Sequence, residues 1–132
     1  MRFSGNPTSP AFSFLAAANN YAPSIVHSSL FDDDTINPWI AGQLFKAAAT
    51  HGHLTPTSSS QSIKRALYGL KNETLDGLAP PLNYTPGKPA FSACYFGTTI
   101  KNGQFVGING GKPSCLSTAQ TSALANALKG LA

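Results

Sequence analysis

Apolar residues at helical spacing fill much of the first half of the chain, and an alternating pattern follows in the last third. The strongest helical pattern runs from about Ile36 to His51. Its apolar positions form one broad face, made of Trp39, Ile40, Leu44, Phe45, Ala47 and Ala48. This spacing predicts an amphipathic helix that packs one face against the rest of the protein.

Both ends of this helix carry local signals. Thr35 or Asn37 is expected to be the N-cap, because hydroxyl and amide side chains satisfy the free N–H groups of a first turn. The acidic run 32–34 lies just ahead, where the helix dipole favours negative charge. Gly52 follows the helix and is expected to end it in a left-handed conformation.

Shorter patterns predict further helices. One covers about residues 10–18 and opens with a proline, which a first turn tolerates. A second begins at a capping box with Ser58 as N-cap and Gln61 three residues on. Its inward residues are expected to be Ile63, Ala66, Leu67 and Leu70. A third opens with another capping box, 117–120, and continues through Leu124, Leu128 and Leu131. Residues 24–31 are predicted to be a short extended piece.

A β-hairpin is predicted near the C-terminal end. The β-prone runs 91–100 and 104–108 flank Asn102-Gly103, and Asn-Gly between two such runs is the strongest short hairpin signal. Residues 78–89 are rich in proline and glycine, which predicts an irregular connection.

The two cysteines, Cys94 and Cys115, match no metal or redox spacing. They are expected to form one disulfide or to remain two buried thiols. The low content of charged residues, 11% against about 25% in an average protein, is common in exported proteins and favours the disulfide. A bridge closing a loop of this length contributes roughly 3 kcal/mol in the loop-entropy model.

Charge and hydropathy exclude several classes of function. The nine basic residues are scattered and form no basic stripe, so we expect no nucleic-acid partner. No stretch reaches the roughly 20 apolar residues of a membrane-spanning helix. Residues 2–18 imitate a signal peptide, but Gly5, Pro7 and Pro10 interrupt them, so no cleavable leader is expected.

Candidate catalytic and metal-binding groups do not form a recognisable set. His51 and His53 could share a metal ion in an extended segment, but no cysteine or carboxylate at suitable spacing completes the ligands. No Gly-x-Ser-x-Gly elbow or paired carboxylates accompany the serines and histidines. We therefore expect no catalytic residues, no metal and no cofactor, and no enzymatic activity. A hydrolase would require that one serine or histidine be essential.

Four segments in order resemble the closing part of a known family. Residues 37–48, 62–70, 77–89 and 100–106 are similar to the end of the type I periplasmic binding proteins of the leucine/isoleucine/valine-binding family. The resemblance extends over residues 10–106. It implies that residues 1–132 are a C-terminal fragment of such a domain, with residues 107–132 as an extension that carries the final helix.

The resemblance also implies a fold and a function. The fold is a partial lobe of a two-lobe α/β receptor, with about four helices and a β-hairpin, which lacks the central strands that helices of such a lobe pack on. The function is capture of a small amino-acid-like solute, outside the cytoplasm, for the permease of an ABC importer. We expect such a fragment to expose apolar helix faces and to be marginally stable or to associate.

Two residues are candidate ligand contacts through this resemblance. Asn37 and Trp39 occupy the approach to the strongest helix. The sequence there is similar to the sequence that lines the ligand cleft in this family. Trp39 could instead anchor the helix in the core, and Asn37 could be only an N-cap. The alternative function is a small secreted interaction or structural domain, held by a Cys94–Cys115 disulfide and without a transport role.

Overall fold

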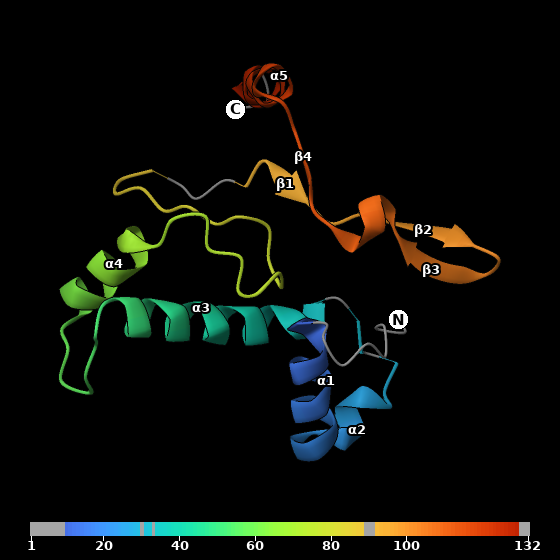
Figure 1. Cartoon of the computed structure of the whole chain (residues 1–132), viewed down its shortest axis with the longest axis horizontal. Helices are drawn as coiled ribbons and strands as arrows, with labels where there is room; N and C mark the ends of the chain where they lie inside the picture. Colours follow the sequence, from blue (N-terminus) through green and yellow to red (C-terminus); the bar gives the residue numbers. More distant parts are fainter. Residues whose placement is uncertain (1–9, 30, 33, 89–91, 130–132) are drawn as a thin grey trace. The chain divides into compact units, whose positions relative to one another are not determined.

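The computed structural model describes residues 10–29, 31–32, 34–88 and 92–129 (Figure 1). The chain forms two compact units, Met1–Ala90 and Phe91–Ala132. The described residues contain five α-helices and two small antiparallel sheets, which confirms the mixed helix and strand class expected for a partial α/β fold. Residues 2–9 of the signal-like segment, Leu131 and Phe91 lie outside the described residues.

The first unit is helical. Its elements are α1 (Pro10–Tyr21), α2 (Pro23–Val26), the 3-10 helix η1 (Asp34–Ile36), α3 (Asn37–His51) and α4 (Ser60–Gly69). The prediction of an extended piece at 24–31 is wrong, because Pro23 opens the helical turn α2. Proline fixes φ near its helical value, so it favours this turn after α1. None of the helices among the described residues has the length and hydropathy of a membrane span.

Helix α3 begins differently from the sequence prediction. Its N-cap position is Ile36, and no side chain caps it there, so the assignment of Thr35 or Asn37 as N-cap is wrong. The cap lies earlier, because η1 starts the helical path three residues ahead. Oδ1 of Asp32 accepts from the backbone N–H of Asp34 at 3.1 Å and of Thr35 at 3.3 Å.

Helix α3 ends in a Schellman motif whose left-handed residue is His53. The amide of His53 donates to the carbonyl of Thr50, and the amide of Leu54 donates to Ala49 at 2.9 Å. Gly52 has φ −88° and His53 has φ +47°, so the expected left-handed role of Gly52 is wrong. A Cβ on Gly52 would lie 2.5 Å from Cβ of Ala66, so the glycine is needed for close packing instead.

The contact between α3 and α4 contains the core of the first unit. Ala48 is fully buried, and Ala66 and Leu70 are 5% and 4% exposed. The partly buried residues around them are Leu44, Ala47, Leu54 and Leu67. The inward placement predicted for Ala66 and Leu70 is therefore confirmed. Small side chains at the contact let the two helices approach closely.

The cap of α4 is one residue later than predicted. Oγ of Ser59 accepts from the amide of Ser62 at 3.2 Å. Ser58 cannot serve as the cap, because its Oγ accepts from the amide of Thr55 at 2.9 Å and closes the preceding turn. The serine cap is thus confirmed in type and wrong in position.

An aromatic cluster joins α1 to the start of α3. Phe14 is buried and stacks on Phe31 with ring centroids 5.9 Å apart. The ring of Trp39 lies 6.0 Å from Phe14 at a tilt of 54°. Aromatic pairs in these geometries contribute about 0.5–1.5 kcal/mol beyond burial, so this cluster fixes α1 against α3.

The second unit consists of two short antiparallel pairs and a helix (Figure 1). Its elements are β1 (Cys94–Tyr95), β2 (Thr98–Lys101), β3 (Gln104–Gly107), the 3-10 helix η2 (Ile108–Gly111), β4 (Ser114–Cys115) and α5 (Thr118–Lys129). The Asn102-Gly103 hairpin is confirmed, with Lys101 opposite Gln104 and both turn residues at positive φ, as a type I′ turn requires. Residues 94–95 pair instead with β4, which the alternating pattern did not reveal.

The capping box that opens α5 is confirmed in both directions. The amide of Ser117 donates to Oε1 of Gln120 at 2.8 Å. The amide of Gln120 donates to Oγ of Ser117 at 3.3 Å. Two N–H groups of the first turn are satisfied by this exchange, which explains why the helix starts here.

Replacing Gly52 with alanine tests the close contact of α3 with α4. We predict that Gly52→Ala lowers the free energy of unfolding by about 1–3 kcal/mol, because two Cβ atoms fixed by the backbone would collide. Gly42→Ala is the matched control in the same helix, where a Cβ meets nothing within 4 Å. It should raise stability by about 0.5–1 kcal/mol. Urea unfolding followed by far-UV circular dichroism measures both, and equal stabilisation by the two variants would contradict the packing.

Candidate functional site

The structure separates the two residues expected to contact a ligand. Asn37 is exposed, and its Nδ2 donates to Oδ1 of Asp34 at 3.2 Å. Trp39 is half-buried against Phe14. Residues two apart on a helix do not face each other, so these side chains do not converge on one point. Asn37 thus lies at the exposed first position of α3, beside Asp34 of η1, and Trp39 belongs to the aromatic cluster.

The indole of Trp39 has one unusual feature. Its Nε1–H is buried and has no hydrogen-bond partner in the described part of the chain. A buried tryptophan N–H normally finds an acceptor, since leaving a donor unpaired costs about 1–3 kcal/mol. Trp39 therefore carries an unsatisfied donor inside the aromatic cluster.

The histidines at the end of α3 lie on the surface. Both His51 and His53 are exposed, and no group of three potential metal ligands occurs among residues that the structure describes. The ring of His51 lies close to Gly69, where an added Cβ would be 2.6 Å from Nε2. His51 therefore packs on the end of α4.

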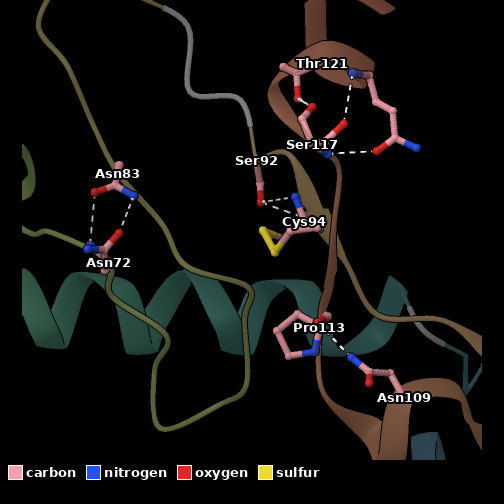
Figure 2. The surroundings of a disulfide bond; sticks show 10 residues. Asn72, Asn83, Ser92, Cys94, Asn109, Pro113, Ser117 and Thr121 are labelled. Atoms are coloured by element: carbon pink, nitrogen blue, oxygen red, sulfur yellow. Dashed lines mark hydrogen bonds between the residues drawn. A yellow bond between two sulfur atoms is a disulfide. The ribbon is translucent and has the colours of Figure 1, made fainter.

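The disulfide between Cys94 and Cys115 is present, which confirms that prediction (Figure 2). The cysteines lie directly opposite each other on β1 and β4. Oγ of Ser92 accepts from the amide of Cys94 at 3.2 Å and donates to its carbonyl at 3.1 Å. Because the two strands share only two residue pairs, the covalent bond is the main link between the ends of this loop.

A hollow that sequence reasoning missed lies between α3 and the segment after α4. Its volume is about 400 Å³. It is lined by Gln43, Lys46, Ala47, Thr50 and His51 of α3, and by Leu70, Glu73, Leu75 and Asp76. We call it the α3–turn pocket. The α3 residues recur at helical spacing, which the sequence could have revealed. Asp76-Gly77 marks a turn in the facing segment, but no local signal shows that this turn faces α3.

A left-handed turn builds the second wall of the α3–turn pocket. Leu75, Asp76 and Gly77 have φ values of +52°, +59° and +91°. The amides of Gly77 and Ala79 both donate to the carbonyl of Thr74, at 3.0 and 2.9 Å. Left-handed conformation costs roughly 1–2 kcal/mol for a residue with a side chain. The turn buries Leu75 and leaves Asp76 exposed.

Paired hydrogen bonds close the base of this loop. Glu73 and Leu82 exchange two backbone hydrogen bonds, of 3.1 and 2.8 Å. Oδ1 of Asn83 accepts from the amide of Asn72, and Nδ2 of Asn83 donates to Oδ1 of Asn72, both at 3.0 Å (Figure 2). Beyond this base, partial burial raises the pKa of the Tyr84 phenol above its ordinary value of 10.0. The loop is therefore held firmly against the pocket.

The pocket carries charges of both signs. Lys46 is on the α3 wall, and Glu73 and Asp76 are on the turn wall. No ion pair joins these groups to each other or to other residues within the described ranges. Oε1 of Glu73 accepts from the amide of Leu75 at 2.7 Å, which orients the carboxylate. The arrangement can bind a small molecule that carries charged groups.

Comparison with known proteins found no matching family model, no matching curated protein and no matching solved structure.

Removal of the disulfide tests how far the second unit depends on it. We predict that Cys94→Ser combined with Cys115→Ser destabilises this unit by roughly 3 kcal/mol, because the loop between the cysteines is no longer closed. The amide of Leu116, which donates to Ala93 at 2.8 Å, should lose protection from hydrogen exchange. The amide of Gly52 in the first unit is the internal control and should keep its protection. Unchanged exchange at Leu116 would show that the strands hold without the bond.

Proposed function

We propose that this chain is the C-terminal part of an extracytoplasmic solute-binding protein that captures a small amino-acid-like solute for the permease of an ABC importer. The role is binding and not catalysis. The proposal rests on the resemblance of residues 37–48 and 62–70, which form α3 and α4. It is supported by three further features of the described residues, namely apolar exposure, the unpaired indole and the disulfide.

Apolar exposure is the structural observation that most supports the proposal. No large side chain is fully buried among the described residues, and three of the six buried apolar residues are alanines. Large apolar residues are exposed in both units, and they are Phe12, Tyr21, Ile25, Phe45, Tyr95, Phe96, Ile100, Phe105, Val106, Ile108 and Leu124. A domain of this length would bury roughly two thirds of its extended surface, including most large apolar side chains. Such surfaces favour a chain that packs against further polypeptide.

The Trp39 indole supports a role for the approach to α3. Its buried Nε1–H has no acceptor in the described residues, and a solute or another lobe could supply one only if the side chains that cover the indole moved. The stacking against Phe14 fixes the ring, which lowers the entropy cost of forming that hydrogen bond. This fits a cleft residue that is also an anchor of the helix.

The disulfide supports a location outside the cytoplasm. Disulfides persist in oxidising compartments such as the periplasm and the cell exterior. The same bond also favours the second candidate, a small secreted interaction domain without a transport role. The small core distinguishes the two, because a self-sufficient domain would need to bury more of its large apolar residues.

Solute binding by the protein purified from its source tests the proposal. We predict saturable binding of leucine, isoleucine, valine or a related amino acid in isothermal titration calorimetry. Trp39→Phe keeps an aromatic ring but removes the N–H, and it should weaken binding about tenfold or more if the indole donates to the solute.

Tyr21→Phe is the matched control for this substitution. It also removes one donor from an aromatic side chain, and Tyr21 is 88% exposed at the end of α1. The affinity of the Tyr21→Phe variant for the solute should equal that of the unsubstituted protein. Absence of amino-acid binding by the purified protein would reject the proposed function. Binding that Trp39→Phe leaves unchanged would restrict Trp39 to anchoring the helix.

A further inference from the structure

The geometry points to a second binding site, in the α3–turn pocket, for a basic amino acid. The compound has two cationic groups and one carboxylate on a short aliphatic stem, and lysine is the simplest example. This site is separate from the first turn of α3, which contains Asn37 and Trp39. The inference goes beyond the proposed function and does not depend on it, because neither Asn37 nor Trp39 lines this pocket.

The pocket has the size and the floor of a small-molecule site. Its volume of about 400 Å³ falls in the range of roughly 300–1,000 Å³ that such sites occupy. Ala47, Leu70 and Leu75 supply apolar surface, and the two leucines are 4% and 9% exposed. An aliphatic stem can make van der Waals contact with the small parts of these side chains that face the pocket.

The charged groups of the pocket match those of the ligand in number and sign. Glu73 and Asp76 offer two carboxylates, and Lys46 offers one ammonium group. None of the three has an ion-pair partner in the part of the chain that the structure describes. Two carboxylates and one ammonium group complement two cationic groups and one carboxylate. A simple diamine would leave Lys46 unmatched, and a neutral amino acid would leave one carboxylate unmatched.

The acidic wall is positioned before any ligand arrives. The backbone of Glu73 is fixed by its two hydrogen bonds to Leu82. Its Oε1 is oriented by the amide of Leu75, and its second oxygen has no bond to a described residue. Asp76 is carried on the left-handed turn, which leaves its carboxylate exposed beside the pocket. Such preorganisation reduces the entropy cost of binding.

Two neutral polar residues extend the α3 wall. Gln43 and Thr50 are seven positions apart, on the same side of α3, with Lys46 between them. Their side chains make no hydrogen bond to any described residue. They can therefore donate to the carboxylate of the ligand on either side of the lysine.

Titration of the whole chain with three related compounds tests the inference. The probes are L-lysine, L-norleucine, which lacks the side-chain ammonium group, and cadaverine, which lacks the carboxylate. Amide chemical shifts of residues 73–77 report binding at this place. We expect saturable shifts with L-lysine, and an affinity about fivefold or more above that for either other probe. No saturable shift with L-lysine, or equal affinity for all three, would overturn the inference.

Isosteric variants separate the contributions of the two walls. Asp76→Asn should weaken binding of both L-lysine and cadaverine about fivefold. Asparagine tolerates the left-handed conformation at this position, so the turn should persist. Lys46→Met should weaken the binding of L-lysine by a similar factor and leave the binding of cadaverine unchanged or tighter.

Lys64→Met is the matched control, because Lys64 is an exposed lysine on α4 outside the pocket. Lys64→Met should change the affinity for neither L-lysine nor cadaverine. If Lys64→Met weakens L-lysine as much as Lys46→Met does, the effect is one of net charge and the inference is wrong. The spectrum of each variant without ligand shows whether it is folded. Binding that depends on charge should also weaken in 0.5 M salt, because the Debye length is then about 4 Å and salt screens the charges of the pocket.

Discussion

The close approach of α3 and α4 is the constraint on which the first unit depends. It requires Gly52, because any side chain there would collide with Ala66. The left-handed His53 then reverses the chain, so α4 can lie on the end of α3. With α4 in this position, Leu70 reaches Ala48, and the segment that follows α4 runs back along α3. The α3–turn pocket exists because of this return.

Local signals predicted those elements that depend on neighbouring residues. The periodicity of α3, the capping box at Ser117 and the Asn102-Gly103 turn each act within a few residues, and each is confirmed. The cap of α3 was misplaced because Thr35 and Asn37 are suitable by type, whereas Asp32 actually accepts the N–H groups. The correct cap can be chosen among nearby polar residues only when the first helical residue is known. Because η1 precedes α3, the helical path begins at Asp34 and not at Asn37.

Features that depend on distant residues were beyond sequence reasoning. Gly52 was assigned to a left-handed conformation, but its role is set by Ala66 on another helix. The pairing of β1 with β4 joins segments separated by a complete hairpin. The pocket needs three residues in left-handed conformation, two of which are Leu75 and Asp76. Asp76-Gly77 is a turn signal. Leucine rarely adopts the left-handed conformation, so the sequence does not indicate that the turn includes Leu75.

The proposal that this chain packs against further polypeptide is supported by the small cores and the exposed apolar side chains of both units. The helix contact of the first unit buries mainly alanine and leucine, and the hairpin of the second unit leaves Ile100 and Phe105 68% and 61% exposed. Such faces are expected where further polypeptide covers them, as in one part of a two-lobe receptor.

The intact mass of the protein isolated from its source, captured with antibodies against residues 117–132, tests this account most directly. The proposed receptor predicts a mass well above the 13.7 kDa of residues 1–132. A mass near 13.7 kDa would contradict it and would favour a self-sufficient domain held by the Cys94–Cys115 disulfide.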